Sequence, residues 1–487
     1  MYDAIQTRRA DASLPVAAPL IVPAVLLLAF GLALVLGATG QYGLLRLYYP
    51  WAALVLGAFL YVVHPATYIE FVWYLWFFSP FVRRFIDYQA GWMNPNPVLL
   101  APFLATGVCV LGLLRNLGRL RIGVSFFYGL VLLSIIYGYT VGLVRNSLFV
   151  ATFSLLEWVV PVLFSLFLVQ TWTQYPAYRT RLKRVFRIGV FLMGVYALVQ
   201  FFFLPAWDAY WIVNAELDSV GEPKPFLVRI FSTMNSPAPF GHAMMAGLLL
   251  VFSELSVGTV MAVIPGLVAF LLSLSRQSWG GWLLGLLVVV TKAEGRFRSR
   301  LVRVLVVSSL FALPLLATDA IYSRISARFE TLSNLEEDNS LAARLAAYKG
   351  VSLRILKDPV GSGIGATGAA QKAAGAQQGG NLDSGFLDIP FALGWLGGFL
   401  YLFGMVRLLL HVARSRVLAD DHFALVAFGI SVGMFAMLAF GKVQSDVSGM
   451  VLWTFLGMAV AAVRYHRARI EQAQASDETP LPDLETA

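Results

Sequence analysis

The sequence predicts an all-α protein that crosses a membrane about 12–14 times. Three observations support this fold class. The 487 residues are 59% hydrophobic and only 13% charged, whereas a soluble domain carries roughly 25% charged residues. The mean hydropathy is +0.73. Apolar runs of spanning length alternate with short basic clusters, which is the pattern that orients a polytopic membrane protein.

The apolar runs define about fourteen candidate spans, because a spanning helix needs roughly 17–25 mostly apolar residues. Their approximate ranges are 18–37, 44–63, 66–82, 97–114, 122–144, 148–170, 186–204, 238–256, 258–274, 278–292, 301–318, 384–408, 423–440 and 446–464. Only His64-Pro65 separates the second span from the third, and only Ser275-Arg276-Gln277 separates the ninth from the tenth. A merger at either point lowers the count towards twelve.

Basic clusters orient these spans. The clusters are Arg115–Arg121, Arg179–Arg187, Lys292–Arg303, Arg414–Arg416 and Arg464–Arg469. With a cytoplasmic N-terminus over residues 1–17, every cluster falls on the cytoplasmic side, as the positive-inside rule requires. The predicted layout then has spans 1 to 11 within residues 18–318, a large periplasmic loop at 319–383, spans 12 to 14 within 384–465, and a disordered cytoplasmic tail at 466–487.

The predicted loop at 319–383 is the longest interruption of the apolar pattern. Loops of this length are usually functional or disordered. Residues 340–357 place their apolar side chains on one helical face, which Leu353 and Leu356 continue. That spacing predicts an amphipathic helix that lies on the membrane or caps a cavity. The glycine-rich stretch 361–368 is expected to form a flexible turn.

The sequence favours neither a metal nor a soluble cofactor. It has a single cysteine, and no His/acid cluster with metal-ligand spacing appears on the predicted outer side. A phosphate-binding loop and a dinucleotide fingerprint are also missing from the sequence. The net charge of +9 is explained by membrane orientation, so nucleic-acid binding is not expected.

Basic residues on the predicted outer side are informative, because orientation does not require them there. Arg276 lies between two strongly apolar spans, where a charge is costly and usually faces a polar cavity; anchoring to lipid headgroups is the alternative. Arg229 precedes the eighth span, and Arg344 lies in the large loop. These three guanidinium groups are candidates for binding a diphosphate, because their planar donors match phosphate oxygens. Arg83 and Arg84 either add to this positive field or anchor headgroups.

Two acids and a histidine complete the candidates. Asp383 stands where the loop re-enters the membrane, so it is either a general base at a partly desolvated site or, with Ser384, a helix cap. Asp388 falls inside the next predicted span, where an ionisable residue is a functional candidate by default. His242, in the eighth span, is a further candidate, although a lone histidine is more often a hydrogen-bonded core residue.

The order of these features resembles the O-antigen ligase and O-antigen polymerase superfamily of bacterial membrane glycosyltransferases. The resemblance covers about residues 225–410. Its motifs, in chain order, are Arg229 with Asn235, Pro237 and Gly241; Ser275 and Arg276 with Gly280; Arg344; the turn Gly361–Gly365; and the helix start Gly394–Gly398.

The resemblance implies an inner-membrane enzyme of the GT-C type that takes a glycan from undecaprenyl diphosphate at the periplasmic face, without a nucleotide sugar or metal. Arg276 and Arg344 match arginines that hold the diphosphate in the family. Ligases commonly carry a His-Asn pair at the re-entry point, and this chain has Asp383-Ser384 instead, which favours a polymerase. An O-antigen ligase and a flippase or exporter of lipid-linked oligosaccharide are the alternatives. The implied partners are the undecaprenyl-diphosphate-linked glycan and membrane lipids, with a chain-length regulator and a flippase as further candidates.

Overall fold

The fold is that of a helical membrane protein. The computed structural model describes residues 31–115, 123–216, 220–252, 257–316, 350–368 and 384–477, together with residues 318, 319, 321–323, 325, 326, 348 and 382. Within these residues every regular element is a helix, and the β pairing is limited to one isolated bridge between Gly221 and Val228. The all-α fold class is therefore confirmed.

The described helices follow one another with short connections. Their bounds are α3 Tyr42–Val63, α4 Pro65–Ala90, η1 Pro97–Leu99, α5 Leu100–Gly107, α6 Cys109–Arg115, α7 Val124–Arg145, α8 Leu148–Gln170, η3 Trp172–Gln174, α9 Tyr175–Phe203, α10 Ala206–Asn214, α11 Pro237–Phe252, α12 Val257–Leu272, α13 Arg276–Lys292, α14 Gly295–Leu316, α18 Gly385–Ala413, α19 Val417–Asp420, α20 His422–Met437 and α21 Asp446–Asp477.

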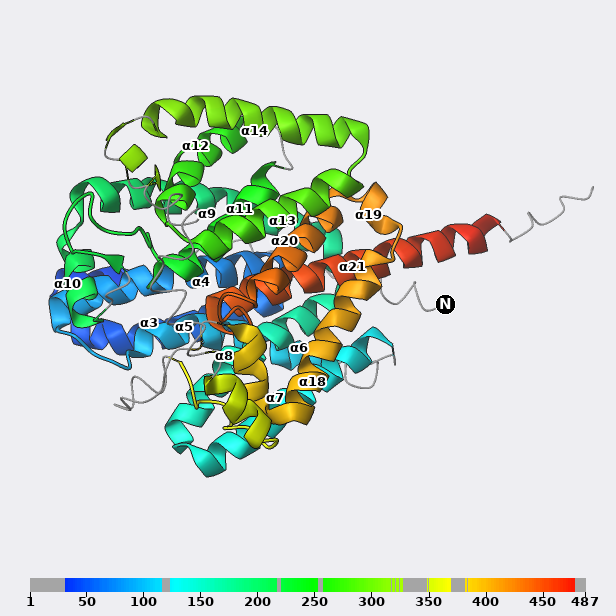
Figure 1. Ribbon diagram of the computed structural model, residues 1–487, viewed down its shortest axis with the longest axis horizontal. Coiled ribbons are helices and arrows are strands. Elements are labelled where there is room, and N and C mark those ends of the chain that lie inside the picture. Colours follow the sequence, from blue (N-terminus) through cyan, green and yellow to red (C-terminus); the bar gives the residue numbers. More distant parts are fainter. Residues whose placement is uncertain are drawn as a thin grey trace, which may run out of the picture.

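Among the described residues, seven helical stretches are long and apolar enough to cross a membrane. They are Tyr42–Val63, Pro97–Arg115, Val124–Arg145, Leu148–Gln170, Trp172–Phe203, Gly385–Ala413 and Asp446–Gln474, and shorter apolar helices cover Pro237–Val251, Gly258–Leu272 and His422–Met437. The chain is thus a multi-pass membrane protein. Its α21 runs through the middle of the bundle, with α14 along one side and α7 and α18 along the other (Figure 1).

Three helices extend past their predicted spans. α9 begins at Tyr175 rather than near residue 186, because Pro176 suits a first helical turn. The basic cluster there is therefore helical, and Arg181 and Arg184 form ion pairs with Glu70 on α4. α4 continues to Ala90, beyond the predicted end at residue 82. α21 continues to Asp477, so residues 466–477 of the predicted disordered tail are helical.

The two ends of the bundle differ in character. At one end, which we call the basic end, Arg464 donates to the carbonyl of Val169 at 3.1 Å. Asp421 there accepts hydrogen bonds from Arg179 at 3.3 Å and His466 at 3.0 Å. The opposite end gathers the turn between α12 and α13, the start of α18 and the connection between α20 and α21, and it carries the candidate site.

The glycine segment, residues 361–365, is packed rather than flexible, so the prediction of a flexible turn was wrong. α18 is broken at Gly394, whose φ is 67°. The amides of Ser362 and Gly363 donate to the carbonyls of Phe391 and Ala392, at 2.8 and 3.0 Å. The break at Gly394 leaves these carbonyls without their hydrogen bonds within the helix, and the two amides replace those bonds. Backbone groups inside a membrane need such partners, because no water is available there. The glycines permit the close approach.

Candidate functional site

The turn between α12 and α13 brings two of the predicted arginines together. Arg276 is the first residue of α13. The guanidinium of Arg229 donates to the carbonyls of Ser273 at 3.4 Å and Leu274 at 3.3 Å. Those carbonyls belong to the end of α12, where helical partners run out. Arg229 and Arg276 are both half-buried, so one arginine contacts this turn and another begins the helix that follows it.

Two further predicted site residues, Arg344 and Asp383, lie outside the described residues. The residue after Asp383, Ser384, stands at the N-cap position of α18 but makes no side-chain cap. Its hydroxyl donates instead to the carbonyl of Leu438, at 3.3 Å. Ser384 thus ties the start of α18 to the end of α20.

His242 lies one turn into α11 and is 1% exposed. Its Nδ1 is 2.7 Å from Oγ of Ser448, and its Nε2 is 3.4 Å from Nε2 of Gln277. Because an amide nitrogen only donates, this amide orientation makes Nε2 of His242 the acceptor and leaves the hydrogen on Nδ1, facing Ser448. His242 is therefore a hydrogen-bonded buried residue that contacts the neighbour of Arg276.

Asp388 is the centre of a polar cluster at the start of α18. Its carboxylate is fully buried and accepts hydrogen bonds from Thr367 at 2.6 Å and from Gln444 at 2.7 Å. Nζ of Lys442 is 3.2 Å from Oδ2 of Asp388 and donates to Oγ1 of Thr367 at 2.8 Å. A buried carboxylate with this many donors and a matching cation meets the conditions for a stable buried ion pair.

The connection between α20 and α21, residues 438–445, joins the arginine turn to the Asp388 cluster. The carbonyl of Gly441 accepts from the amide of Gly385 at 3.0 Å. Gly441 also packs so closely on α13 that a Cβ there would lie 2.5 Å from Oε1 of Gln277. Lys442 and Gln444 of the same connection contact Asp388. One short connection thus touches both α13 and α18 and shapes the site between them.

A fourth helix contributes an acid that the sequence analysis missed. Glu157 of α8 is half-buried and interacts electrostatically with Asp446, Lys442 and Asp388. The rule that singled out Asp388, an acid inside an apolar span, applies equally to Glu157. Lys442 was also missed, although it is a basic residue on the predicted outer side, as Arg276 is. Gln444 and Ser448 carry no comparable signal.

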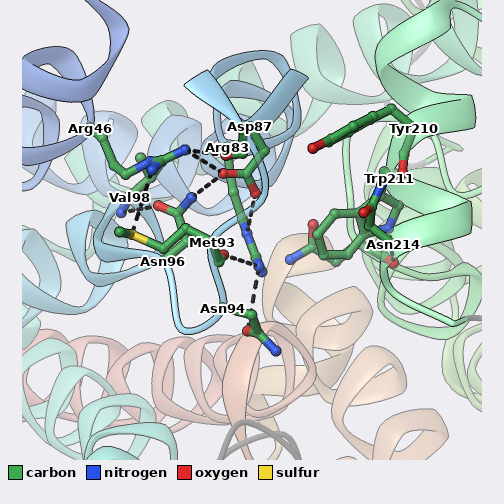
Figure 2. A network of polar contacts seen from close by, with 12 residues as sticks. Arg46, Arg83, Asp87, Met93, Asn94, Asn96, Val98, Tyr210, Trp211 and Asn214 are labelled. Carbon is green, nitrogen blue, oxygen red and sulfur yellow. Dashed lines mark hydrogen bonds and ion pairs between the residues drawn. The ribbon is translucent and has the colours of Figure 1, made fainter. Parts of the chain in front are cut away.

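Arg83 is held inside the protein. It donates to Asp87 at 3.2 Å and to the carbonyl of Met93 at 3.0 Å. Figure 2 shows Arg46 reaching the same Asp87 carboxylate, at 2.9 Å, from α3. The guanidinium carbon of Arg83 also lies 4.6 Å from the ring centroid of Trp211, a cation–π distance. Neither predicted role, headgroup anchor or diphosphate ligand, suits a guanidinium engaged in this way.

Arg84 is equally enclosed, with a side chain that is 0% exposed. It binds the carboxylate of Asp208 on α10 and the carbonyl of Ser232. Asp208 additionally accepts from Tyr196 at 2.7 Å and from Gln200 at 2.8 Å. This network holds α4, α9 and α10 together beside the segment that leads from Arg229 to α11.

The part of the chain that the structure describes contains no group of three or more His, Cys, Asp or Glu side chains that could hold a metal ion. A family model described as O-antigen ligase matches residues 261–402. The match supports the resemblance of this chain to the O-antigen ligase and polymerase superfamily. A search of the curated proteins finds no match. The matched region includes Arg276 and Asp388.

Proposed function

We propose that this protein polymerises undecaprenyl-diphosphate-linked oligosaccharide repeat units into exopolysaccharide or O-antigen, at the periplasmic face of the inner membrane. The observation that supports the proposal is the placement of Arg229 and Arg276 at the turn between α12 and α13, where Arg229 binds the turn and Arg276 begins α13. Two guanidinium groups at one helix start suit a diphosphate, whose oxygens they bind in pairs. The amide groups at the N-terminus of α13 favour an anion in the same place.

In the proposed reaction, a hydroxyl oxygen of the acceptor sugar attacks the anomeric carbon of the lipid-linked donor. The bond between that carbon and the diphosphate oxygen breaks, and its electron pair leaves with undecaprenyl diphosphate. Arg229, Arg276 and Arg344 stabilise the negative charge that develops on the leaving group, which is usually the largest catalytic contribution. An attack from the opposite side inverts the anomeric configuration. Asp383 is the base that the sequence predicts for the hydroxyl proton, and no metal ion takes part.

The polymerase is favoured over the ligase by the re-entry sequence Asp383-Ser384, where ligases commonly carry His-Asn. The ligase is the second candidate, because the matching family model carries the O-antigen ligase description. Membrane lipids and the undecaprenyl-diphosphate-linked glycan are the partners that either reaction requires. A polymerase would also work beside a flippase and a chain-length regulator.

The test uses a deletion strain complemented with the wild type, Arg276→Ala or Lys224→Ala, with the surface glycan resolved by length. Lys224 is an exposed lysine paired with Glu222, so Lys224→Ala is the matched control for loss of a charge. We expect Arg276→Ala to lose the long-chain ladder while single repeat units persist, and the control to keep it. Long polymer that accumulates on the lipid carrier, and is missing from lipid A, would identify a ligase instead. An unchanged ladder in Arg276→Ala would refute the proposed site.

A further inference from the structure

Four ionisable side chains from different elements converge beside the arginine turn. They are Asp388 of α18, Lys442 of the α20–α21 connection, Asp446 at the start of α21 and Glu157 of α8. Helices α8 and α21 pack closely here, since a Cβ at Gly449 would lie 3.3 Å from Cγ of Pro161, about one turn beyond Glu157. Glu157 is nine residues past the start of α8, or about 13 Å along the helix. Glu157 therefore lies inside a spanning helix, where ionisable residues are costly and usually functional.

The charges in this group do not balance. Lys442 is matched by Asp388, whose carboxylate it approaches to 3.2 Å. Neither Glu157 nor Asp446 forms an ion pair with another residue that the structure describes. Each of these two carboxylates repels the other. The group therefore holds three carboxylates and a single ammonium group, that of Lys442.

Two buried polar atoms next to the carboxylates lack a hydrogen-bond partner in the described part of the chain. They are Oγ of Ser154 and Oε1 of Gln444. Ser154 is 2% exposed and lies three residues before Glu157, on the same face of α8. Gln444 is fully buried and uses its other amide atom to bind Asp388. Buried polar atoms of this kind require a partner, and the hydroxyl groups of a sugar supply both donors and acceptors.

The backbone at Asp446 is strained in the same place. Asp446 has φ of 56°, which places a non-glycine residue in the left-handed region. Such conformations persist where the surrounding structure holds them, and they cluster at functional sites. The following turn is held by a bond from the amide of Gly449 to the carbonyl of Ser445, at 2.8 Å. The strained residue therefore stands where the α20–α21 connection enters α21.

We propose that Glu157 is the catalytic base that accepts the proton of the acceptor hydroxyl, and that Asp446, Lys442 and Asp388 are positioning residues. This assignment rests on the proposed glycosyl transfer and names a different base from Asp383. As the hydroxyl oxygen bonds to the anomeric carbon, its proton passes to the Glu157 carboxylate. The bond to the diphosphate breaks, and its electron pair leaves with the diphosphate. The proton is released to water after the product departs.

The test compares full-length wild type, Glu157→Gln and Glu157→Asp, with Glu222→Gln as the control for neutralising an exposed acid. Each is assayed for transfer from the lipid-linked repeat unit and for binding of undecaprenyl diphosphate in lipid nanodiscs. We expect Glu157→Gln to lower kcat about 10²–10⁴-fold, the usual contribution of a general base, with undecaprenyl diphosphate binding unchanged. Glu157→Asp keeps a carboxylate and recovers part of that loss.

Several outcomes would overturn the inference. If Glu157→Gln keeps the wild-type kcat while Arg276→Ala is inactive, the proposed glycosyl transfer is supported and Glu157 is not its base. If kcat falls in Asp383→Asn and not in Glu157→Gln, the base is Asp383, where the loop re-enters the membrane. An equal loss in Glu157→Gln and Glu157→Asp, accompanied by loss of undecaprenyl diphosphate binding, would mean a structural role. If Lys442 is a positioning residue, Lys442→Met is expected to shift the acidic limb of the pH–rate profile. If Lys442 is only structural, that limb should not move.

Discussion

The ion pair between Arg84 and Asp208 yields a prediction that separates a structural arginine from a substrate-binding one. Both side chains are 0% exposed, and they join α4 to α10. Burial raises the pKa of Asp208 despite the opposing effect of Arg84, so the charged carboxylate is itself costly to bury. Asp208→Ala is therefore expected to act chiefly by leaving the Arg84 guanidinium buried without its counter-ion.

Removing one partner of a buried pair typically costs about 3–5 kcal/mol of stability. Replacing both partners with apolar residues of similar volume is often neutral. Asp208→Ala also removes the acceptor for Tyr196 and Gln200, while the carbonyl of Ser232 still accepts a hydrogen bond from Arg84. The expected order of stability is wild type, then Arg84→Met combined with Asp208→Leu, then Asp208→Ala.

The assay is thermal unfolding of the full-length protein in one detergent at a fixed heating rate. We expect Asp208→Ala to unfold several degrees lower than the wild type, and the double variant to recover most of that loss. Glu222→Gln, at an exposed pair, should change little, since such pairs contribute about 0–1 kcal/mol. An Asp208→Ala protein as stable as the wild type, or a double variant less stable than Asp208→Ala, would refute the reasoning.

Two further predictions concern the fold. Gly363 has φ of 80°, and a Cβ there would lie 2.4 Å from the Gly142 backbone. Gly363→Ala should therefore lower the unfolding temperature. The left-handed conformation alone costs an alanine about 1–2 kcal/mol, and the steric clash of its Cβ with the Gly142 backbone adds to this cost. Gly280→Ala, in an open helical position, should not lower it. Burial opposes ionisation of Asp421, but hydrogen bonds from His466 and others lower its pKa below the ordinary 3.8. The ionised Asp421 therefore stabilises the folded protein fully at pH values above 3.8, and this contribution is lost as the pH falls below 3.8. Asp421→Asn should therefore flatten the acidic part of a plot of stability against pH.

Local features of the sequence were enough to predict much of the fold. The break between α3 and α4 falls at His64, and Arg276 stands at the break between α12 and α13. Both follow from the interruption of apolar runs by proline or by polar residues. The ends of α4, α9 and α21 were missed, because charged residues there find partners in helices far along the chain. Such partners are invisible to a local hydropathy pattern.

The candidate site was only partly predictable for the same reason. Arg229 and Arg276 were found because charges near an apolar span are conspicuous. That Arg84 is an internal ion-pair partner depends on Asp208, 124 positions away. That His242 binds Ser448 depends on a contact across 206 positions. Neither relation has a sequence signal.

Composition alone determined that this is a helical membrane protein, because 13% charged residues cannot cover a soluble surface of this size. Periodic basic clusters predicted its orientation, because orientation depends on the count of charges in each connection. Tertiary structure decided which charges are available for chemistry. Packing encloses Arg83 and Arg84 in ion pairs, and it brings Glu157, Asp388 and Lys442 together around the α20–α21 connection. Which charges are enclosed in ion pairs depends on helix packing, so the structural role of Arg84 cannot be recognised from its place in the sequence.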